Sequence, residues 1–427
     1  MLSREENERL TEVGPGTPMG NLLRRYWYPV AASSEMMDHP TKHIQILGES
    51  LVLYRDRRGH LGLIGDTCPH RRVSMIYGIP EDDGLRCAYH GWKFDGAGKC
   101  LEMPAEPTES VFKEKVRIAA YPVAELGGMV FAYLGPEPVP LLPRWEVFVR
   151  QDALRDIGVA EVPCNWLQIM ENSVDPIHVE WLHQYFNNYI LERVGKTDLQ
   201  RPALRHEKIG FDVFEHGIIK RRVLEGETED NEDWKTGHPV LFPHILVAGS
   251  TRRTTFQIRV PIDDTRTMHW WYTCYVKRPG VDTGSEEKIP FYQVPVPKLD
   301  DNGQPDWQML DFNNGGQDMI AWYSQGPVTD RTLEHLGESD QGVILYRKVL
   351  KEQLEKSARG EDPMNVFHDA AKNVSIKVQL EEAKLAGGKY NRETSRRQGG
   401  ATRFSPVLDA ESERDEKLTQ VATSPVV

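Results

Sequence analysis

The sequence lacks several features that would narrow its class at once. None of its apolar runs approaches the roughly 20 residues that cross a bilayer as a helix. Its content of 39% hydrophobic and 27% charged residues is ordinary for a globular chain in water. Five cysteines in 427 residues are too few and too scattered for a disulfide scaffold. We therefore expect a globular protein without a membrane segment, whose thiols are free for metal.

An excess of basic residues is also lacking. The 52 Lys and Arg residues against 64 Asp and Glu give a formal net charge of −12. Because neutralising phosphates requires a basic face, we expect no nucleic-acid partner, although one basic patch would still serve a small redox protein. The N-terminal stretch is charged from its fourth residue and has no apolar core of a secretory signal. We therefore expect a cytoplasmic protein.

Length and turn pattern indicate at least two domains. Short strands separated by Gly-rich turns dominate the N-terminal third, and the proline-rich stretch 135–145 is typical of a linker. Strand signals return over about 203–276, and helical signals follow over about 306–356. We expect an α+β protein with an N-terminal helical segment at 1–40, an antiparallel β domain at 41–140, a second domain with an antiparallel sheet and helices at 141–390, and a polar C-terminal arm at 391–427.

Four soft metal ligands lie in two short motifs. Cys68 and His70 are two apart, and after sixteen intervening residues Cys87 and His90 are three apart. Each pair follows a predicted strand at a turn, so two facing loops would offer two thiolates and two imidazoles. This set suits a tetrahedral zinc ion, or a [2Fe-2S] cluster with two cysteines on one iron and two histidines on the other. Because each loop contributes one residue of each type, the cluster is favoured and zinc is the alternative.

A second motif, "DPIHVEWLH", places Asp175, His178 and His183 in order. Histidines five apart do not share a face of a regular α-helix, so the segment must be irregular for them to converge, and Pro176 offers a break. Two imidazoles with one distant carboxylate form the facial triad that binds non-haem Fe(II). Taken alone, this spacing is more typical of core histidines.

Together the motifs resemble those of a known family. The stretches "CPHRRV" and "CAYHGWKFD" resemble the Rieske-domain signature, and D-x-x-H-x-x-x-x-H resembles the iron motif of Rieske-type non-haem iron oxygenases. The resemblance runs from "EENERLTEVGPGTPMGNLLRRYWYPVA" to "GPVTDRTLEHLG" and is strongest for the phthalate dioxygenase-like branch, built from one subunit type. It implies a helix-grip-like catalytic domain after an N-terminal Rieske domain. Arg72 departs from the pattern, because the family commonly carries glycine there.

The resemblance implies roles for the motif residues. Cys68, His70, Cys87 and His90 would bind the Rieske cluster, and His178, His183 and Asp318, in "NNGGQDMIAWYSQG", would bind Fe(II). Asp306 and Asp311 are competing carboxylates for the third position. Asp175 would bridge a cluster histidine of one subunit to an iron-ligand histidine of the next, which requires a head-to-tail homotrimer or a stacked hexamer. Asn172 would be a polar neighbour of the iron, or a locally bonded helix residue.

The implied activity is that of a terminal oxygenase. Electrons from NAD(P)H would arrive through a ferredoxin or a flavin reductase, and O2 would oxidise an aromatic acid. Members of the branch hydroxylate or cis-dihydroxylate aromatic carboxylates such as phthalate, or O-demethylate methoxyaryl acids such as vanillate, dicamba and 5,5'-dehydrodivanillate. We favour O-demethylation of a lignin-derived methoxyaryl acid with formaldehyde release. The alternatives from other classes are a Rieske electron-transfer protein, against which the second motif argues, and a zinc-binding structural protein.

Candidate substrate-binding residues lie on two predicted strands. In "STRRTTFQIRVP", Arg252 or Arg259 would pair with a substrate carboxylate. In "LFPHILVAG", Phe242 and His244 would face a pocket. Arginines on a solvated strand face and ordinary core packing are the alternative interpretations.

Overall fold

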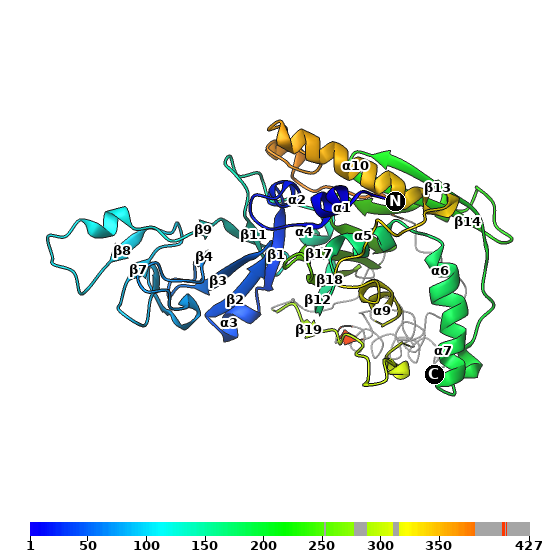
Figure 1. Cartoon of the computed structure of the whole chain (residues 1–427), viewed down its shortest axis with the longest axis horizontal. Coiled ribbons are helices and arrows are strands. Elements are labelled where there is room, and N and C mark those ends of the chain that lie inside the picture. The colour runs from blue at the N-terminus through cyan, green and yellow to red at the C-terminus, as the bar shows by residue number, and fades with distance from the viewer. Residues whose placement is uncertain (252, 277–287, 311–315, 381–403, 406, 408–427) are drawn as a thin grey trace, which may run out of the picture.

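The computed structural model describes residues 1–427 except 252, 277–287, 311–315, 381–403, 406 and 408–427. The molecule is elongated, and a narrow N-terminal β region projects from a larger region that contains one long sheet (Figure 1). The predicted α+β class is confirmed.

The N-terminal segment begins with two short capped helices. In α1 (Arg4–Thr11) the Ser3 hydroxyl accepts the Glu6 N–H while the Glu6 carboxylate accepts the Ser3 N–H. In α2 (Pro18–Leu23) the Thr17 hydroxyl caps the first turn, and proline at the first helical position has no N–H to satisfy. The segment expected to be helical also contains a strand, β1 (Trp27–Ala32), which pairs with a strand a hundred residues later.

Three small antiparallel sheets form the N-terminal β region. They are β1–β11–β10, with β10 (Val123–Leu126) and β11 (Met129–Tyr133); β2–β3–β4–β9, with β2 (Thr41–Ile46), β3 (Glu49–Arg55), β4 (Leu61–Gly65) and β9 (Ala120–Tyr121); and β5–β6–β7–β8, with β5 (Ile79–Glu81), β6 (Gly84–Arg86), β7 (Lys93–Phe94) and β8 (Cys100–Glu102). The tip of this region has its own small core, which includes Cys68, Cys87, Trp92 and Phe94. The candidate cluster ligands therefore belong to a separately packed unit.

A long sheet organises the larger region. Its described strands run in the order β13–β14–β15–β16–β17–β18–β12–β19 and pair antiparallel, except β12 with β19. Their bounds are β12 (Ala153–Val162), β13 (His206–Phe214), β14 (Gly217–Leu224), β15 (His238–Leu241), β16 (Ile245–Gly249), β17 (Arg253–Pro261), β18 (Thr267–Val276) and β19 (Phe291–Gln293). The antiparallel sheet expected for the second domain is present.

The larger region also contains helices, some of which carry the second motif. They are α4 (Glu146–Val149), α5 (Trp166–Ser173), α6 (His178–Glu180), α7 (Asn187–Arg193), α8 (Glu232–Lys235), α9 (Asp318–Tyr323) and α10 (Gln341–Ala358), with α3 (Glu35–Asp38) beside β1. Met319 and Trp322 of α9 pack with Ile169 of α5 on Trp271 of β18. Burying these large side chains contributes of the order of 1.5–3 kcal/mol each. The start of α9 is thereby held over the sheet.

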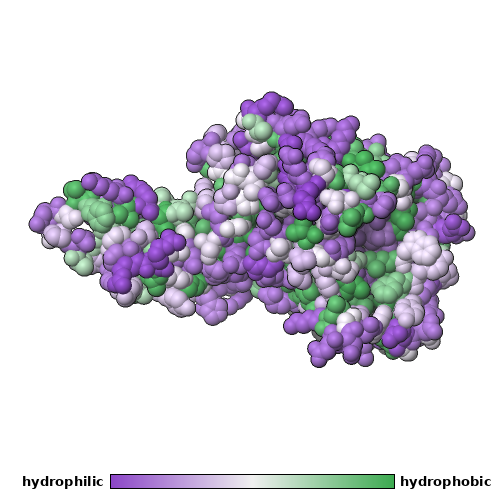
Figure 2. Space-filling view, in the orientation of Figure 1, coloured by the Kyte–Doolittle hydropathy of each residue, from purple (hydrophilic) through white to green (hydrophobic). Residues whose placement is uncertain are grey.

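Most of the arm expected at 391–427 lies outside the described residues. Two of its described residues contact the sheet: the Ser405 hydroxyl donates to the Asp156 carboxylate, and Val407 packs on Tyr275. Among the described helices, none is long and apolar enough to cross a membrane. The face of the molecule shown in Figure 2 is largely hydrophilic, with hydrophobic residues in patches between.

Candidate active site

The two Cys/His loops share one backbone geometry. In each, the cysteine N–H donates to the carbonyl five residues on (2.9 Å for Cys68, 2.8 Å for Cys87), and its carbonyl accepts the N–H four residues on (3.0 Å in both). The residue at that fourth position is left-handed in both loops, with φ of 65° at Arg72 and 75° at Gly91. Arg72 therefore occupies a position where the equivalent loop uses glycine.

The four side chains differ in their exposure to solvent. The thiols of Cys68 and Cys87 are buried, while the imidazoles of His70 and His90 reach the surface with ring centroids 4.5 Å apart. Trp92 stacks on His70 at 4.4 Å. Burial, together with neighbouring Cys87, raises the pKa of the Cys68 thiol to about 11. Buried thiols become thiolates only beside a cation, so this donor set fits a metal cluster with its histidine side outward.

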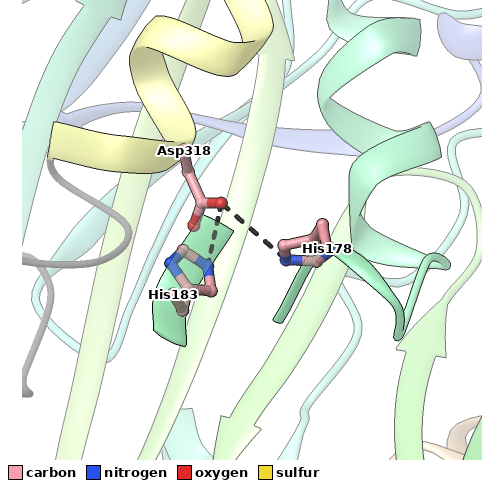
Figure 3. A group of neighbouring side chains, drawn as sticks. All are labelled: His178, His183 and Asp318. Atoms are coloured by element: carbon pink, nitrogen blue, oxygen red, sulfur yellow. Dashed lines mark ion pairs between the residues drawn. The ribbon is translucent and has the colours of Figure 1, made fainter. Parts of the chain in front are cut away.

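A second group lies in the larger region. The Asp318 Oδ1 atom is 3.1 Å from His183 Nε2 and 3.8 Å from His178 Nε2, and the three side chains point toward one another (Figure 3). Their ligand atoms all lie within 4.8 Å of one another. The structure thus brings together the two histidines of the motif and the aspartate chosen for the third position.

A π-helical segment, Trp181–Phe186, explains how histidines five apart converge. It follows α6 directly and contains His183. A π-helix has a wider turn, in which residues i and i+5 are hydrogen-bonded neighbours. The expected irregularity is therefore real, but it lies after Pro176 and His178 and has a different cause from the proline break.

Gln317 holds one of the imidazoles. The His183 Nδ1–H donates to Gln317 Oε1 at 2.9 Å, and the Gln317 amide donates to Asn187 Oδ1 (2.7 Å) and the Leu310 carbonyl (2.9 Å). This places the proton on Nδ1 and leaves the Nε2 lone pair toward Asp318. Gln317 was not predicted from the sequence as a site residue. Its position directly before Asp318 is the feature of the sequence that could have indicated it.

The group fits a divalent metal ion. Asp318 is 3% exposed, and its Oδ1 accepts no hydrogen bond within the described part of the chain. Burial alone would raise the pKa of the Asp318 carboxyl, but His183, His178 and Arg259 hold it below its usual range. A buried anionic oxygen without a donor is costly unless a cation compensates it. Two imidazole nitrogens and one carboxylate oxygen are a donor set suited to non-haem Fe(II).

Asp175 sits beside this group. Its Oδ1 accepts the Ile177 N–H at 2.7 Å, and its Oδ2 lies 3.5 Å from His178 Nδ1. Burial alone would raise the pKa of the Asp175 carboxyl, but His178 and the Ile177 N–H outweigh it, and the pKa lies below its usual range. The Asp175 N–H donates to the Asn172 carbonyl at 3.1 Å, so the backbone of Asn172 helps to shape this turn.

Two of the four predicted substrate residues line an apolar cavity. Phe242 and His244 line an apolar cavity with Tyr26, Trp145 and Ile258, and none of the three clustered side chains lines it.

Arg259 is fully buried and donates to the Gln257 carbonyl (2.8 Å) and side-chain oxygen (3.0 Å). Asp306 is exposed and accepts the Gln308 N–H at 3.0 Å, as a turn residue does. Arg252 and Asp311 lie outside the described residues.

Comparison with known proteins bears directly on these two groups. A family model for the Rieske [2Fe-2S] domain matches residues 26–122. The chain is 43% identical over 380 residues (88% of this chain, 86% of the relative) to the 5,5'-dehydrodivanillate O-demethylase oxygenase subunit of Sphingobium sp. (strain NBRC 103272 / SYK-6). It is 32% identical over 403 residues (87% and 90%) to the phthalate 4,5-dioxygenase oxygenase subunit of Pseudomonas putida.

Solved structures share the fold. NdmA of Pseudomonas putida CBB5 matches with a TM-score of 0.57 at 19% identity, over 79% of this chain and 92% of that chain. The oxygenase in a ferredoxin complex of carbazole 1,9a-dioxygenase matches with a TM-score of 0.55 at 19% identity, over 87% and 97%.

A Rieske domain joined to a sheet domain that gathers two histidines and an aspartate defines a class, the Rieske non-haem iron oxygenases. The chain belongs to this family as an oxygenase subunit, with relatives that include 5,5'-dehydrodivanillate O-demethylase. It is therefore an enzyme with a Rieske [2Fe-2S] cluster and a non-haem iron, as its motifs predicted.

Proposed function

We propose that this oxygenase O-demethylates a methoxyaryl acid, with electrons supplied by a ferredoxin or a flavin reductase. The cluster would be bound by Cys68, His70, Cys87 and His90, and the Fe(II) by His178, His183 and Asp318. The observation that carries the proposal is the convergence of the last three side chains in a chain 43% identical to an O-demethylase subunit.

The chemistry consumes one O2, two electrons and two protons per methoxy group. One oxygen atom is inserted into a methyl C–H bond, the other leaves as water, and the hydroxylated methyl departs as formaldehyde to leave a phenol. His178, His183 and Asp318 would hold a ferrous ion, which would supply activation of O2. The chain itself orients His183 through Gln317, holds the His178 ring beside Asp175, and packs Trp271 and Trp322 with Met319, the residue after Asp318.

Electron transfer between copies of the chain is part of the proposal. In one chain the cluster loops and the triad lie at opposite ends of the molecule (Figure 1). Asp175 already contacts the iron-side imidazole of His178 and retains 26% exposure of its side chain. A head-to-tail homotrimer, alone or stacked as a hexamer, would bring a neighbour's His70 or His90 to that carboxylate.

An oxygen-uptake screen tests the substrate class. The reconstituted enzyme, with a reductase and NAD(P)H, is given 5,5'-dehydrodivanillate, vanillate, 3-methoxybenzoate and phthalate, and formaldehyde is assayed. Formaldehyde in step with O2 uptake is the expected result. Uptake with a diol and no formaldehyde would select ring oxidation, the second candidate, which the 32% identity to a phthalate dioxygenase subunit favours.

A His178→Ala variant tests oxygenase chemistry itself. Loss of substrate-dependent O2 uptake with the visible spectrum of the cluster retained is expected. Unchanged turnover would refute the proposed iron site. A colourless protein that contains zinc and no acid-labile sulfide would refute the cluster.

A further inference from the structure

Lys220 stands on the face of the sheet that the iron site covers. Antiparallel partners share a face, and the register runs from Ile218 through Val240, Leu246 and Gln257 to Trp271. Trp271 packs against α9, whose first residue is Asp318. Lys220, two residues along β14 from Ile218, therefore projects to the same side as the triad.

The Lys220 ammonium lies near two carboxylates but pairs directly with neither in the described structure. It lies close enough to Asp175 and Asp318 to interact electrostatically, yet it forms no hydrogen bond or ion pair in the described structure. Both carboxylates are engaged by imidazoles, at 3.5 Å for Asp175 and 3.1 Å for Asp318. Burial lowers the pKa of Lys220 to about 8, so it is mostly charged at neutral pH. Lys220 is partly buried, and a partly buried cation without a direct partner is a place where an anion gains by binding.

Neighbouring cations on the same face are already engaged. The Arg222 Nε donates to Asp233 at 2.8 Å, and Arg259 donates to both oxygens of Gln257. With a divalent ion at the triad, the whole site carries an excess of positive charge. Lys220 is therefore the group best placed to receive an anionic substituent of a bound aromatic ring.

We propose that the Lys220 ammonium binds the carboxylate of the aromatic acid and so determines which end of the substrate faces the iron. This rests on the proposed function and names a specificity-determining residue within it. A single ammonium is a point charge on a flexible stem, so it demands one carboxylate without imposing the planar geometry of an arginine pair.

Binding of a charged and an uncharged probe tests the proposal. Calorimetric titration under anaerobic conditions uses 3-methoxybenzoate and its methyl ester, which differ in one negative charge. Lys220→Met should weaken binding of the acid about 10- to 100-fold and leave the ester nearly unchanged. Lys220→Arg should restore much of the acid binding. Lys208→Met, on β13 and paired with Glu229 at 2.6 Å, is the matched control and should bind as wild type.

The outcomes separate the two proposals. Acid binding that survives in Lys220→Met, or acid and ester binding that fall together at equal cluster content, would overturn the role of Lys220 and leave the oxygenase proposal standing. A wild-type protein that oxidises no aromatic acid would overturn the substrate class and the Lys220 role with it. In steady state, a raised KM with little change in kcat is the expected signature for the acid.

Discussion

Arg72 holds a backbone conformation that glycine adopts more readily. Its φ of 65° matches the 75° of Gly91 at the equivalent position of the other loop. A side chain there costs of the order of 1–2 kcal/mol, offset in part by the entropy of glycine in the unfolded chain. We predict that Arg72→Gly stabilises the cluster loop by up to about 1 kcal/mol, seen as a higher temperature for loss of the visible absorbance of the cluster.

The converse substitution is the control. A Cβ at Gly91 would lie 3.1 Å from the Pro104 ring, so Gly91→Ala adds a close contact to the left-handed strain and should lower the same temperature. An unchanged or lowered value for Arg72→Gly would mean that the arginine makes a compensating contact.

Gln317 acts on the metal through His183. Replacement by leucine removes the acceptor that keeps the proton on Nδ1, so Nε2 is no longer fixed as a ligand. We predict a 10- to 100-fold weaker affinity for Fe(II), measured by titration of iron-depleted protein that retains its cluster. Gln325→Leu, beyond the far end of α9, is the control, because the Gln325 amide contacts the Ala321 carbonyl and is remote from His183. Equal Fe(II) affinities in the two variants would show that Gln317 does not support iron binding.

Residues whose role depends on local spacing could be predicted from the sequence. Cys68, His70 and their partners stand out because loop ligands are close in the chain. Gln317 and Lys220 could not be found that way, since their significance comes from residues about a hundred positions away, His183 for Gln317 and Asp318 for Lys220. Phe242 stays a prediction: it lies in the turn between β15 and β16 and lines an apolar cavity that none of the three triad side chains lines.

At the scale of elements, a buried charge network joins α5 to α10. Glu171 accepts from Arg331 (2.7 and 2.9 Å) and from Arg347 of α10 (2.6 Å), and Arg331 is fully buried. Glu171 precedes the iron motif by four residues, so the network fixes where that motif begins. An irregular helix between α5 and the π-helical segment was predicted from the sequence. This charge network was not, because it joins residues too far apart in the chain for a local sequence pattern to reveal their contact.

Glu171→Gln should destabilise the fold in a pH-dependent way. Removing the carboxylate leaves buried guanidinium groups uncompensated, at a cost of about 3–5 kcal/mol. Burial raises the pKa of Glu171, but Arg331 and Arg347 hold it below its usual range. A lowered folded-state pKa gives stability that is present above the unfolded value of about 4.3 and lost as pH falls below it. Denaturant unfolding should show the full difference at pH 7 and a smaller one near pH 4.

The exposed Glu352 of α10 provides the matched substitution. Glu352→Gln changes the same charge at the surface and should alter stability by less than about 0.5 kcal/mol at either pH. A difference between Glu171→Gln and wild type that stays constant across this range would mean that the carboxyl has the same pKa in the folded and the unfolded protein.

At the scale of the whole molecule, the separation of the two metal groups predicts that electrons pass between neighbouring chains of an oligomer. Cluster loops and triad lie at opposite ends of one chain (Figure 1), so a route within one chain would be long. We predict that Cys68→Ser chains, which lack the cluster, and His178→Ala chains, which lack the iron, are each inactive alone. Co-expressed in one oligomer, they should recover about a quarter of wild-type activity, because random mixing pairs an intact cluster with a neighbour's intact iron at that frequency.

Asp175 gives this experiment its direction. The carboxylate contacts His178 of its own chain, so it should be needed on the chain that accepts the electron. Adding Asp175→Asn to the Cys68→Ser chain should abolish the recovered activity, whereas adding it to the His178→Ala chain should leave that activity intact. Equal loss of activity from both placements would indicate a structural effect of Asp175. No recovery of activity when Cys68→Ser and His178→Ala chains are co-expressed would mean that electrons pass within a single chain.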